Sequence, residues 1–255
     1  MPVTYETVDR TAVVTIERPE TRNAVDRATA EALLDAWRRF EADDQVDVGV
    51  LTGAGGTFCS GADLRRFDLV DRPEGPMGMS RLQVSKPTIA AIEGHAVAGG
   101  LELALWCDLR VAADDAVLGV FSRRWGVPLI DGGTQRLPRL IGLSRAMDLV
   151  LTGRAVPAAE AHAMGLVNRL APSGGALAAA LELAATIASY PQATVRTDRQ
   201  AMLDGSGRSL DEGLAIERRI GVTVLDVARR GAARFADGAG RHGAGVPAGD
   251  DPEST

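Results

Sequence analysis

The stretch that decides the fold is residues 86–108, KPTIAAIEGHAVAGGLELALWCD. The apolar run Pro87 to Glu93 predicts a buried strand, Gly94 to Gly100 predicts a turn, and Leu101 to Trp106 predicts an apolar helix. Adjacent glycines let a ligand approach the backbone closely, and the first N–H groups of a helix have no partner within that helix. The stretch therefore predicts an α/β unit with a binding site where its helix begins.

The same order of strand, turn and helix recurs on the N-terminal side of this stretch. The apolar positions of residues 26–43 recur at spacings of three and four, which predicts an amphipathic helix with Asp26 as its cap. Residues 68–85 contain several prolines and glycines and predict a mobile loop with a short helix at its end. The expected strands are Val3 to Val8, Ala12 to Glu17, Val46 to Thr52 and Leu109 to Ala113.

From Leu143 onward the pattern becomes mainly helical, and an α/β core followed by a helical C-terminal part is expected. The run from Asp237 to the C-terminus is rich in Gly, Pro, Ala and Asp, and we expect it to be frayed. The expected helices are 145–151, 158–164, 177–189, 193–203 and 210–230.

Composition excludes several classes of protein. Hydrophobic residues make up 45% of the 255 residues and charged residues 24%, which is the balance of a globular chain with a large core. The net charge of −6 gives no positive field for phosphates, so we expect no nucleic acid partner. Charged residues interrupt the longest apolar run before it reaches the roughly 20 residues that span a bilayer, so no membrane partner is expected.

The cysteine, histidine and lysine counts narrow the function further. The two cysteines form no CxxC pair and the three histidines show no metal-ligand spacing, so a disulfide scaffold and a metal site are not expected. The start shows no secretory leader, and a cytoplasmic location is expected. The only lysine, Lys86, follows no glycine loop and belongs to no YxxxK pair, so a phosphate loop is absent. A Schiff-base lysine would have to be Lys86, beside a proline at a strand edge.

Glu102 is the strongest candidate for chemistry. It follows Gly99 by three residues, so it lies near the start of the helix, where N–H groups and the helix dipole suit a developing oxyanion. Its apolar neighbours would resist its ionisation and make it a general acid or base near neutral pH. The alternative is that Glu102 lies on a solvated stripe or caps its own helix.

Two other turns are weaker candidates. The turn from Cys59 to Asp63 contains Gly61 and could supply a second backbone donor, although most such turns only reverse the chain. Asp131 stands before two glycines, where it could equally be a helix cap or a turn residue.

Taken together, the motifs resemble those of the enoyl-CoA hydratase/isomerase (crotonase) family over nearly the whole chain. Each motif is weak alone, but their order and spacing are specific. The matching segments are 17–19 with Asn23-Ala24, 57–64, 86–94, 98–104, Cys107-Asp108, 133–138 and 151–154.

This resemblance implies an α/β fold, a crotonase-like spiral of ββα units with a helical C-terminal trimerisation region. It implies an acyl-CoA thioester as substrate, no separate cofactor, and a homotrimer or a dimer of trimers. The spiral core would span residues 1–192, the helical oligomerisation region 193–237 and a disordered tail 238–255. The backbone N–H groups of Ala62 and Gly99 would form the oxyanion hole, with Glu102 as the first glutamate. Residues implied to contact the substrate or its CoA are Ala24, Ser60, Gly61, Asp63, Leu64 and Gly100.

One departure bears on the reaction. Family hydratases place a second glutamate about twenty residues after the first, and here that position falls on Ser122. Asp131 is a partial replacement, since it precedes Thr134 by three residues as an aspartate does in the dienoyl-CoA isomerase and naphthoyl-CoA synthase branches.

Four readings follow. The first is hydration of a 2-enoyl-CoA, with Glu102 and Asp131 handling protons. The second is a family isomerase that relies on the same two carboxylates. The third is a catalytically impaired acyl-CoA binding protein, because Ser122 removes one acid. The fourth and weakest is a nucleotide-binding oxidoreductase, because residues 53–56 do not complete GxGxxG.

Overall fold

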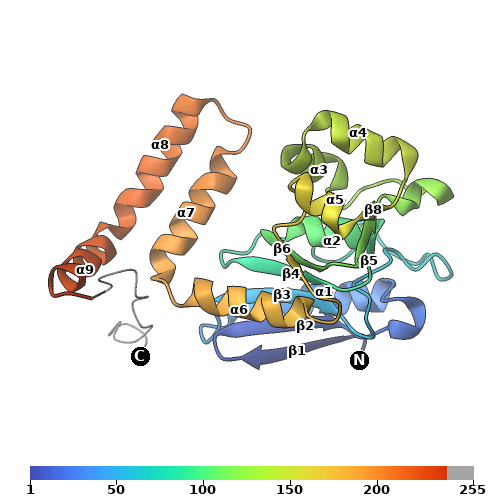
Figure 1. Ribbon diagram of the computed structural model, residues 1–255, viewed down its shortest axis with the longest axis horizontal. Helices are drawn as coiled ribbons and strands as arrows, with labels where there is room; N and C mark the ends of the chain where they lie inside the picture. The colour runs from blue at the N-terminus through green and yellow to red at the C-terminus, as the bar shows by residue number, and fades with distance from the viewer. Residues whose placement is uncertain (240–255) are drawn as a thin grey trace.

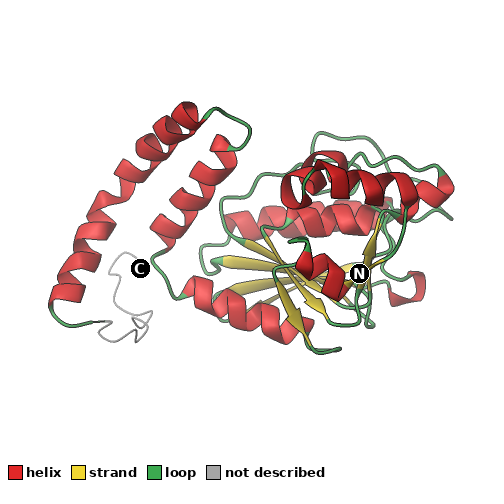
Figure 2. Ribbon diagram, turned by 45° about the horizontal axis from the view of Figure 1, so that its top comes forward, coloured by secondary structure: helices red, strands yellow, loops and turns green. Residues whose placement is uncertain are grey.

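The computed structural model describes residues 1–239, which form two sheets with helices packed around them (Figures 1 and 2). Chain segments pass in turn from the large sheet to the small one, as β4 leads to β5 and β6 to β7, which is the expected α/β spiral. The large sheet has the order β1 (Val3–Val8), β2 (Thr11–Ile16), β3 (Val48–Gly53), β4 (Thr88–Ile92), β6 (Leu109–Ala113), β9 (Arg169–Ala171). The small sheet has the order β5 (His95–Val97), β7 (Val117–Gly119), β8 (Val156–Pro157).

The large sheet is buried on both faces. Only β1 and β2 pair antiparallel within it, and the other neighbours pair parallel. Because side chains alternate along a strand, Leu51 faces α1 (Arg27–Ala42) and packs with Trp37, while Val50 faces α6 (Ala176–Ala188) and packs with Leu183. This double burial explains why the central strands read as continuous apolar runs.

The remaining helices lie around and beyond the small sheet. They are α2 (Gly99–Trp106), α3 (Gly133–Ile141), α4 (Leu143–Thr152), α5 (Ala158–Ala163), α7 (Gln192–Gly205), α8 (Leu210–Gly221), α9 (Leu225–Ala236) and the 3₁₀ turns η1 (Pro19–Thr21), η2 (Phe121–Trp125) and η3 (Val222–Val224). The predicted cap is confirmed, because the Asp26 carboxylate accepts the N–H of Thr29 at the start of α1.

Three sequence-based expectations are wrong. Residues 95–97 are not a turn but strand β5, because they pair in parallel with β7. Residues 210–230 are not one helix: after Gly221, the β-branched residues Val222 to Val224 form η3, which separates α8 from α9. In residues 68–85, all of them described, the chain forms turns and bends with no helix. The sequence reading also missed β7, β8, β9 and α3.

Lys86 has a structural position. Its side chain is buried, and its Nζ donates hydrogen bonds to the carbonyls of Phe40 (2.8 Å) and Asp43 (2.6 Å) at the end of α1. Burial lowers the pKa of this ammonium. Lys86 therefore ties α1 to the start of β4.

Helices α7, α8 and α9 stand to one side of the sheet-containing body (Figure 1). None of the side chains described in these three helices is buried. Two ion pairs join α7 to the body, Arg196 with Asp47 (2.8 Å) and Arg199 with Asp108 (2.8 Å). No helix among residues 1–239 has the length and apolar character needed to cross a membrane. Residues 240–255 of the expected tail lie outside the described residues.

Candidate active site

Gly61 and Gly99 bring two distant loops into contact. A Cβ placed on Gly61 would lie 2.8 Å from the Gly99 nitrogen, and Gly61 has φ +96°, so a side chain there would be both strained and in collision. Ala98, just before α2, has φ 53° and ψ −126°, a conformation that L-residues rarely adopt. The Ala98 N–H donates to the Gly119 carbonyl (2.9 Å), which holds this conformation in place.

The N–H groups of Ala62 and Gly99 lie on these two loops. Val25 donates to the Gly61 carbonyl (2.8 Å) and accepts from the Asp63 N–H (2.9 Å), so this bridge uses the neighbours of Ala62 and leaves the Ala62 N–H pointing away. Within residues 1–239, neither the Ala62 N–H nor the Gly99 N–H, which opens α2, donates to a protein acceptor. Both residues are partly exposed. The pair can therefore donate to one oxyanion.

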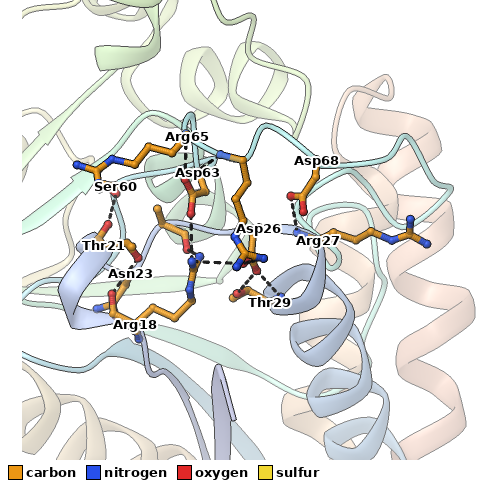
Figure 3. Close-up of polar contacts among 12 residues, drawn as sticks. Arg18, Thr21, Asn23, Asp26, Arg27, Thr29, Ser60, Asp63, Arg65 and Asp68 are labelled. Atoms are coloured by element: carbon orange, nitrogen blue, oxygen red, sulfur yellow. Dashed lines mark hydrogen bonds and ion pairs between the residues drawn. The ribbon is translucent and has the colours of Figure 1, made fainter.

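An arginine holds the loop that carries Ala62. Figure 3 shows Arg18 between two carboxylates, with its Nη2 3.0 Å from Asp63 and 3.3 Å from Asp26. The Arg18 Nη1 also donates to the Ala24 carbonyl. Burial disfavours the Asp63 carboxylate, but the Arg18 hydrogen bond and two backbone N–H groups outweigh it and lower the Asp63 pKa. Because Asp63 directly follows Ala62, Arg18 helps to fix the direction of the Ala62 N–H.

An asparagine and a serine complete this support (Figure 3). The Asn23 Oδ1 accepts the Arg18 N–H (2.9 Å), and its Nδ2 donates to the carbonyls of Ala54 (2.8 Å) and Thr57 (2.7 Å). The Ser60 hydroxyl donates to the Thr21 carbonyl (3.3 Å). The predicted contact residues Ala24, Ser60, Gly61 and Asp63 thus lie together in one polar cluster around Ala62. The sequence reading missed the part played by Arg18, although Arg18 belongs to a quoted motif.

Glu102 is 3% exposed and lies one turn into α2, on the helix that Gly99 opens. Its Oε1 accepts the backbone N–H groups of Asp131 (2.9 Å) and Gly133 (2.8 Å), and no described group donates to Oε2. Burial raises the pKa of Glu102 to about 7. The Gly133 hydrogen bond lowers this pKa, and the nearby negative charge of Asp131 raises it. Glu102 neither caps its own helix nor lies on a solvated stripe, and Oε2 is the oxygen that can exchange a proton.

Asp131 is buried beside Glu102, but its carboxylate has other partners. Its Oδ1 accepts the Met77 N–H (3.0 Å) and the Ser80 hydroxyl. Arg136 donates to the carbonyls of Asp131 (3.0 Å) and Ser80 (2.6 Å). The cap of α3 is Gly132, so the cap reading of Asp131 is wrong. Asp131 positions both the loop that binds Glu102 and the segment 75–80. The sequence reading missed the parts played by Ser80 and Arg136, although Arg136 lies in the matching segment 133–138.

Ser122 lies in η2, three residues after the end of β7, which pairs with β5. It is 6% exposed, and its Oγ has no hydrogen-bond partner in the described part of the chain. A buried hydroxyl without a partner costs about 1–3 kcal/mol. Ser122 stands at the position where the resemblance implies a second glutamate.

The other predicted site residues have simpler surroundings. A Cβ on Gly100 would lie 2.7 Å from the Cys59 carbonyl carbon, so Gly100 lets α2 approach the Cys59 loop. Leu64 is exposed beside the cluster around Ala62. Burial raises the Cys59 pKa to about 12, which leaves an unreactive thiol in the core. Among residues 1–239, no group of three or more His, Cys, Asp or Glu side chains could hold a metal ion.

The raised pKa of Glu102 predicts a dependence of stability on pH. Between pH 4.5 and about 7 the folded state binds more protons than the unfolded state, so the free energy of unfolding falls as pH rises through this range. At about 1.36 kcal/mol per pKa unit, the ionised carboxyl costs about 3 kcal/mol above pH 7. Glu102→Gln cannot ionise at this position. The melting temperature of the variant minus that of the wild type should therefore increase between pH 5 and pH 8. Differential scanning calorimetry measures this, and a pH-independent difference would contradict the raised pKa.

Comparisons with known proteins give matches over most of the chain. Residues 6–239 match the family model described as enoyl-CoA hydratase/isomerase. Enoyl-CoA hydratase EchA19 of Mycobacterium tuberculosis is 36% identical over 242 residues, covering 89% of this chain and 90% of that protein. (E)-Benzylidenesuccinyl-CoA hydratase of Thauera aromatica is 36% identical over 222 residues, covering 84% of this chain and 87% of that protein. The crystal structure of enoyl-CoA hydratase EchA1 from Mycobacterium marinum superposes with a TM-score of 0.89 at 41% identity, covering 92% of this chain and 96% of that one.

Proposed function

The chain belongs to the enoyl-CoA hydratase/isomerase family, and we propose that it adds water to the double bond of a 2-enoyl-CoA. One arrangement carries this proposal: two unpaired backbone N–H groups, on Ala62 and Gly99, and a buried carboxyl with a pKa of about 7 one helical turn away. The enzyme is a hydro-lyase acting on acyl-CoA metabolites of the fatty-acid type.

The geometry supports a reaction with one acid–base group. The thioester oxygen accepts the N–H groups of Ala62 and Gly99, which draws electrons from the conjugated double bond. The ionised Glu102 removes a proton from water as the water oxygen bonds to C3, and the π electrons move to form the enolate. Glu102 then returns the proton to C2, which gives the 3-hydroxyacyl-CoA with its atoms and charge balanced. An oxyanion donor is worth about 3–4 kcal/mol of transition-state stabilisation.

The purified chain mixed with crotonyl-CoA tests the proposal directly. Hydration removes the conjugated thioester, so its ultraviolet absorbance should fall with enzyme concentration. Binding of the thioester without loss of absorbance would favour the acyl-CoA binding protein instead.

Ser122 favours a second candidate, because moving a double bond needs only one base. In that reaction Glu102 would take a proton from C2 of a 3-enoyl-CoA and deliver it to C4, with the same oxyanion hole. Formation of conjugated absorbance from 3-hexenoyl-CoA detects it. A rate above that of crotonyl-CoA hydration would make isomerisation the main activity.

We expect Ser122→Glu to raise the hydration rate of crotonyl-CoA about tenfold, because general acid–base groups contribute about 10²- to 10⁴-fold when well placed. The new carboxyl would share proton transfer with Glu102. Ser122→Gln is the matched control, since it has the same size and cannot exchange a proton. Steady-state kinetics measure both, and equal rates in the two variants would contradict a proton-transfer role at this position.

We propose that the chain forms a homotrimer or a dimer of trimers through α7–α9. Apolar side chains on these helices lie exposed, among them Met202, Leu210 and Phe235, and a cleft of about 620 Å³ between α7 and α8 is lined partly by Leu214. A second copy would cover this apolar surface. Light scattering should give three or six times the chain mass of 26.7 kDa, and a monomer at micromolar concentration would contradict it.

The partner we propose is the acyl-CoA thioester alone. Coenzyme A enters as part of the substrate, so the reaction needs no resident cofactor, and neither nucleic acid nor membrane is part of the proposal. The cytoplasmic location stays a prediction.

A further inference from the structure

We propose that Met77 limits the width of the acyl site beside the oxyanion hole, so that the site prefers straight-chain acyl groups to those with bulky substituents at C3. This inference rests on the proposed binding of a thioester at Ala62 and Gly99. It identifies a specificity-determining residue and, with it, a class of acyl group.

Met77 lies directly against Gly99. A Cβ placed on Gly99 would be 3.0 Å from the Met77 Cε and 3.2 Å from its Sδ, and the Met77 side chain is only 1% exposed. A thioester oxygen bound to the Gly99 N–H would lie about 2.9 Å from that nitrogen. The first carbons of the acyl group then lie close to the end of the Met77 side chain. Substituents on those carbons compete with Met77 for space.

The backbone of Met77 is held on both sides. Its N–H donates to the Asp131 Oδ1 (3.0 Å), and Gly78 donates to the Gly75 carbonyl (2.8 Å). Gly75 and Gly78 have φ +95° and +88°, and a Cβ on Gly78 would lie 3.0 Å from the Ala30 Cα. These close contacts leave the segment 75–80 packed on α1, although the sequence had suggested a mobile loop. Adaptation to the acyl group therefore falls to the flexible thioether side chain.

Asp131 links Met77 to the proposed acid–base group, Glu102. Its carboxylate holds Met77, while its backbone N–H holds the Glu102 Oε1 (2.9 Å). Asp131 therefore contacts both Met77 and Glu102. An acyl group that displaces the backbone of Met77 would also disturb Glu102. This coupling increases the discrimination against acyl groups with bulky substituents at C3.

Calorimetric titration with saturated thioesters tests the proposal without requiring turnover. Butanoyl-CoA is the straight-chain probe, and 3-phenylpropanoyl-CoA carries a phenyl ring at C3. In Met77→Ala, the Kd of 3-phenylpropanoyl-CoA should fall about tenfold relative to that of butanoyl-CoA, because the freed space accepts the ring. Met79→Ala is the matched control: Met79 is also fully buried on this segment, and its truncation should leave the Kd ratio within about twofold of the wild type.

Met77→Val provides a second variant if truncation to alanine prevents folding, and it should shift the Kd ratio in the same direction by about threefold. An unchanged ratio in the folded Met77 variants, or an equal shift in Met79→Ala, would overturn the proposal. A wild type that binds both thioesters but does not consume crotonyl-CoA would contradict the proposed hydration alone. That result would leave the proposal for Met77 standing. A wild type that binds neither thioester would overturn both proposals.

Discussion

Glu102→Gln should lower kcat for crotonyl-CoA hydration by about 10²- to 10⁴-fold with little change in KM. The glutamine keeps the shape of the side chain, and its carbonyl can still accept the N–H groups of Asp131 and Gly133 that bind Oε1. What it loses is the ability to accept a proton from water and return it to C2. Stopped-flow or steady-state absorbance measurements with crotonyl-CoA would give the ratio.

The pH profile supplies an independent measure of the same role. Because the ionised carboxylate removes the proton from water, kcat/KM of the wild type should fall as pH drops below about 7, where Glu102 becomes protonated. The residual activity of Glu102→Gln should lack this inflection. Turnover that survives in Glu102→Gln on every enoyl-CoA the wild type converts would show that Glu102 is not the acid–base group.

Asp131→Asn is the matched comparison for Glu102. The asparagine Oδ1 can still accept from Met77 and Ser80, so a residue that only positions its neighbours should lose less than about tenfold in kcat. A loss as large as that of Glu102→Gln would show that Asp131 has taken the proton-transfer role absent at Ser122.

Gly99→Pro should lower kcat by about 10²- to 10³-fold, because proline has no N–H and removes one of the two oxyanion donors. Gly99 is the first residue of α2, so no helical hydrogen bond depends on the missing N–H. The loss should therefore fall on turnover rather than on folding. Circular dichroism checks the fold, and crotonyl-CoA hydration measures the rate.

Two further variants distinguish the loss of the backbone N–H from the effect of the atoms that a side chain adds. Gly99→Ala adds the same Cβ, which meets chiefly the flexible end of Met77, and keeps the N–H, so its loss should stay below about tenfold. Ala62→Ser also keeps its N–H and should retain most activity. Equal losses in Gly99→Pro and Gly99→Ala would point to packing rather than to the donor.

The sequence by itself determined the fold class and predicted the principal site residues. Some signals depend on only a few neighbouring residues and can be recognised without a structure. They are the strand periodicity, the Asp26 cap and the two glycines that begin α2. The spaced motifs identified the family, and the resemblance implied the roles that we propose for Ala62, Gly99 and Glu102. The apolar neighbours of Glu102 in the sequence correctly predicted a carboxyl that titrates near neutral pH.

Only the tertiary structure decided how these residues are held. Arg18 meets Asp63 across 45 positions, Asp131 meets Met77 across 54, and Glu102 accepts from Asp131 across 29. The short strand β5 exists because β7 pairs with it, and its own sequence resembles a turn. Local patterns report the preferences of neighbouring residues, whereas these contacts depend on where the folded sheets and loops meet. The width of the acyl site, set where Met77 lies against Gly99, is therefore a property of the packing.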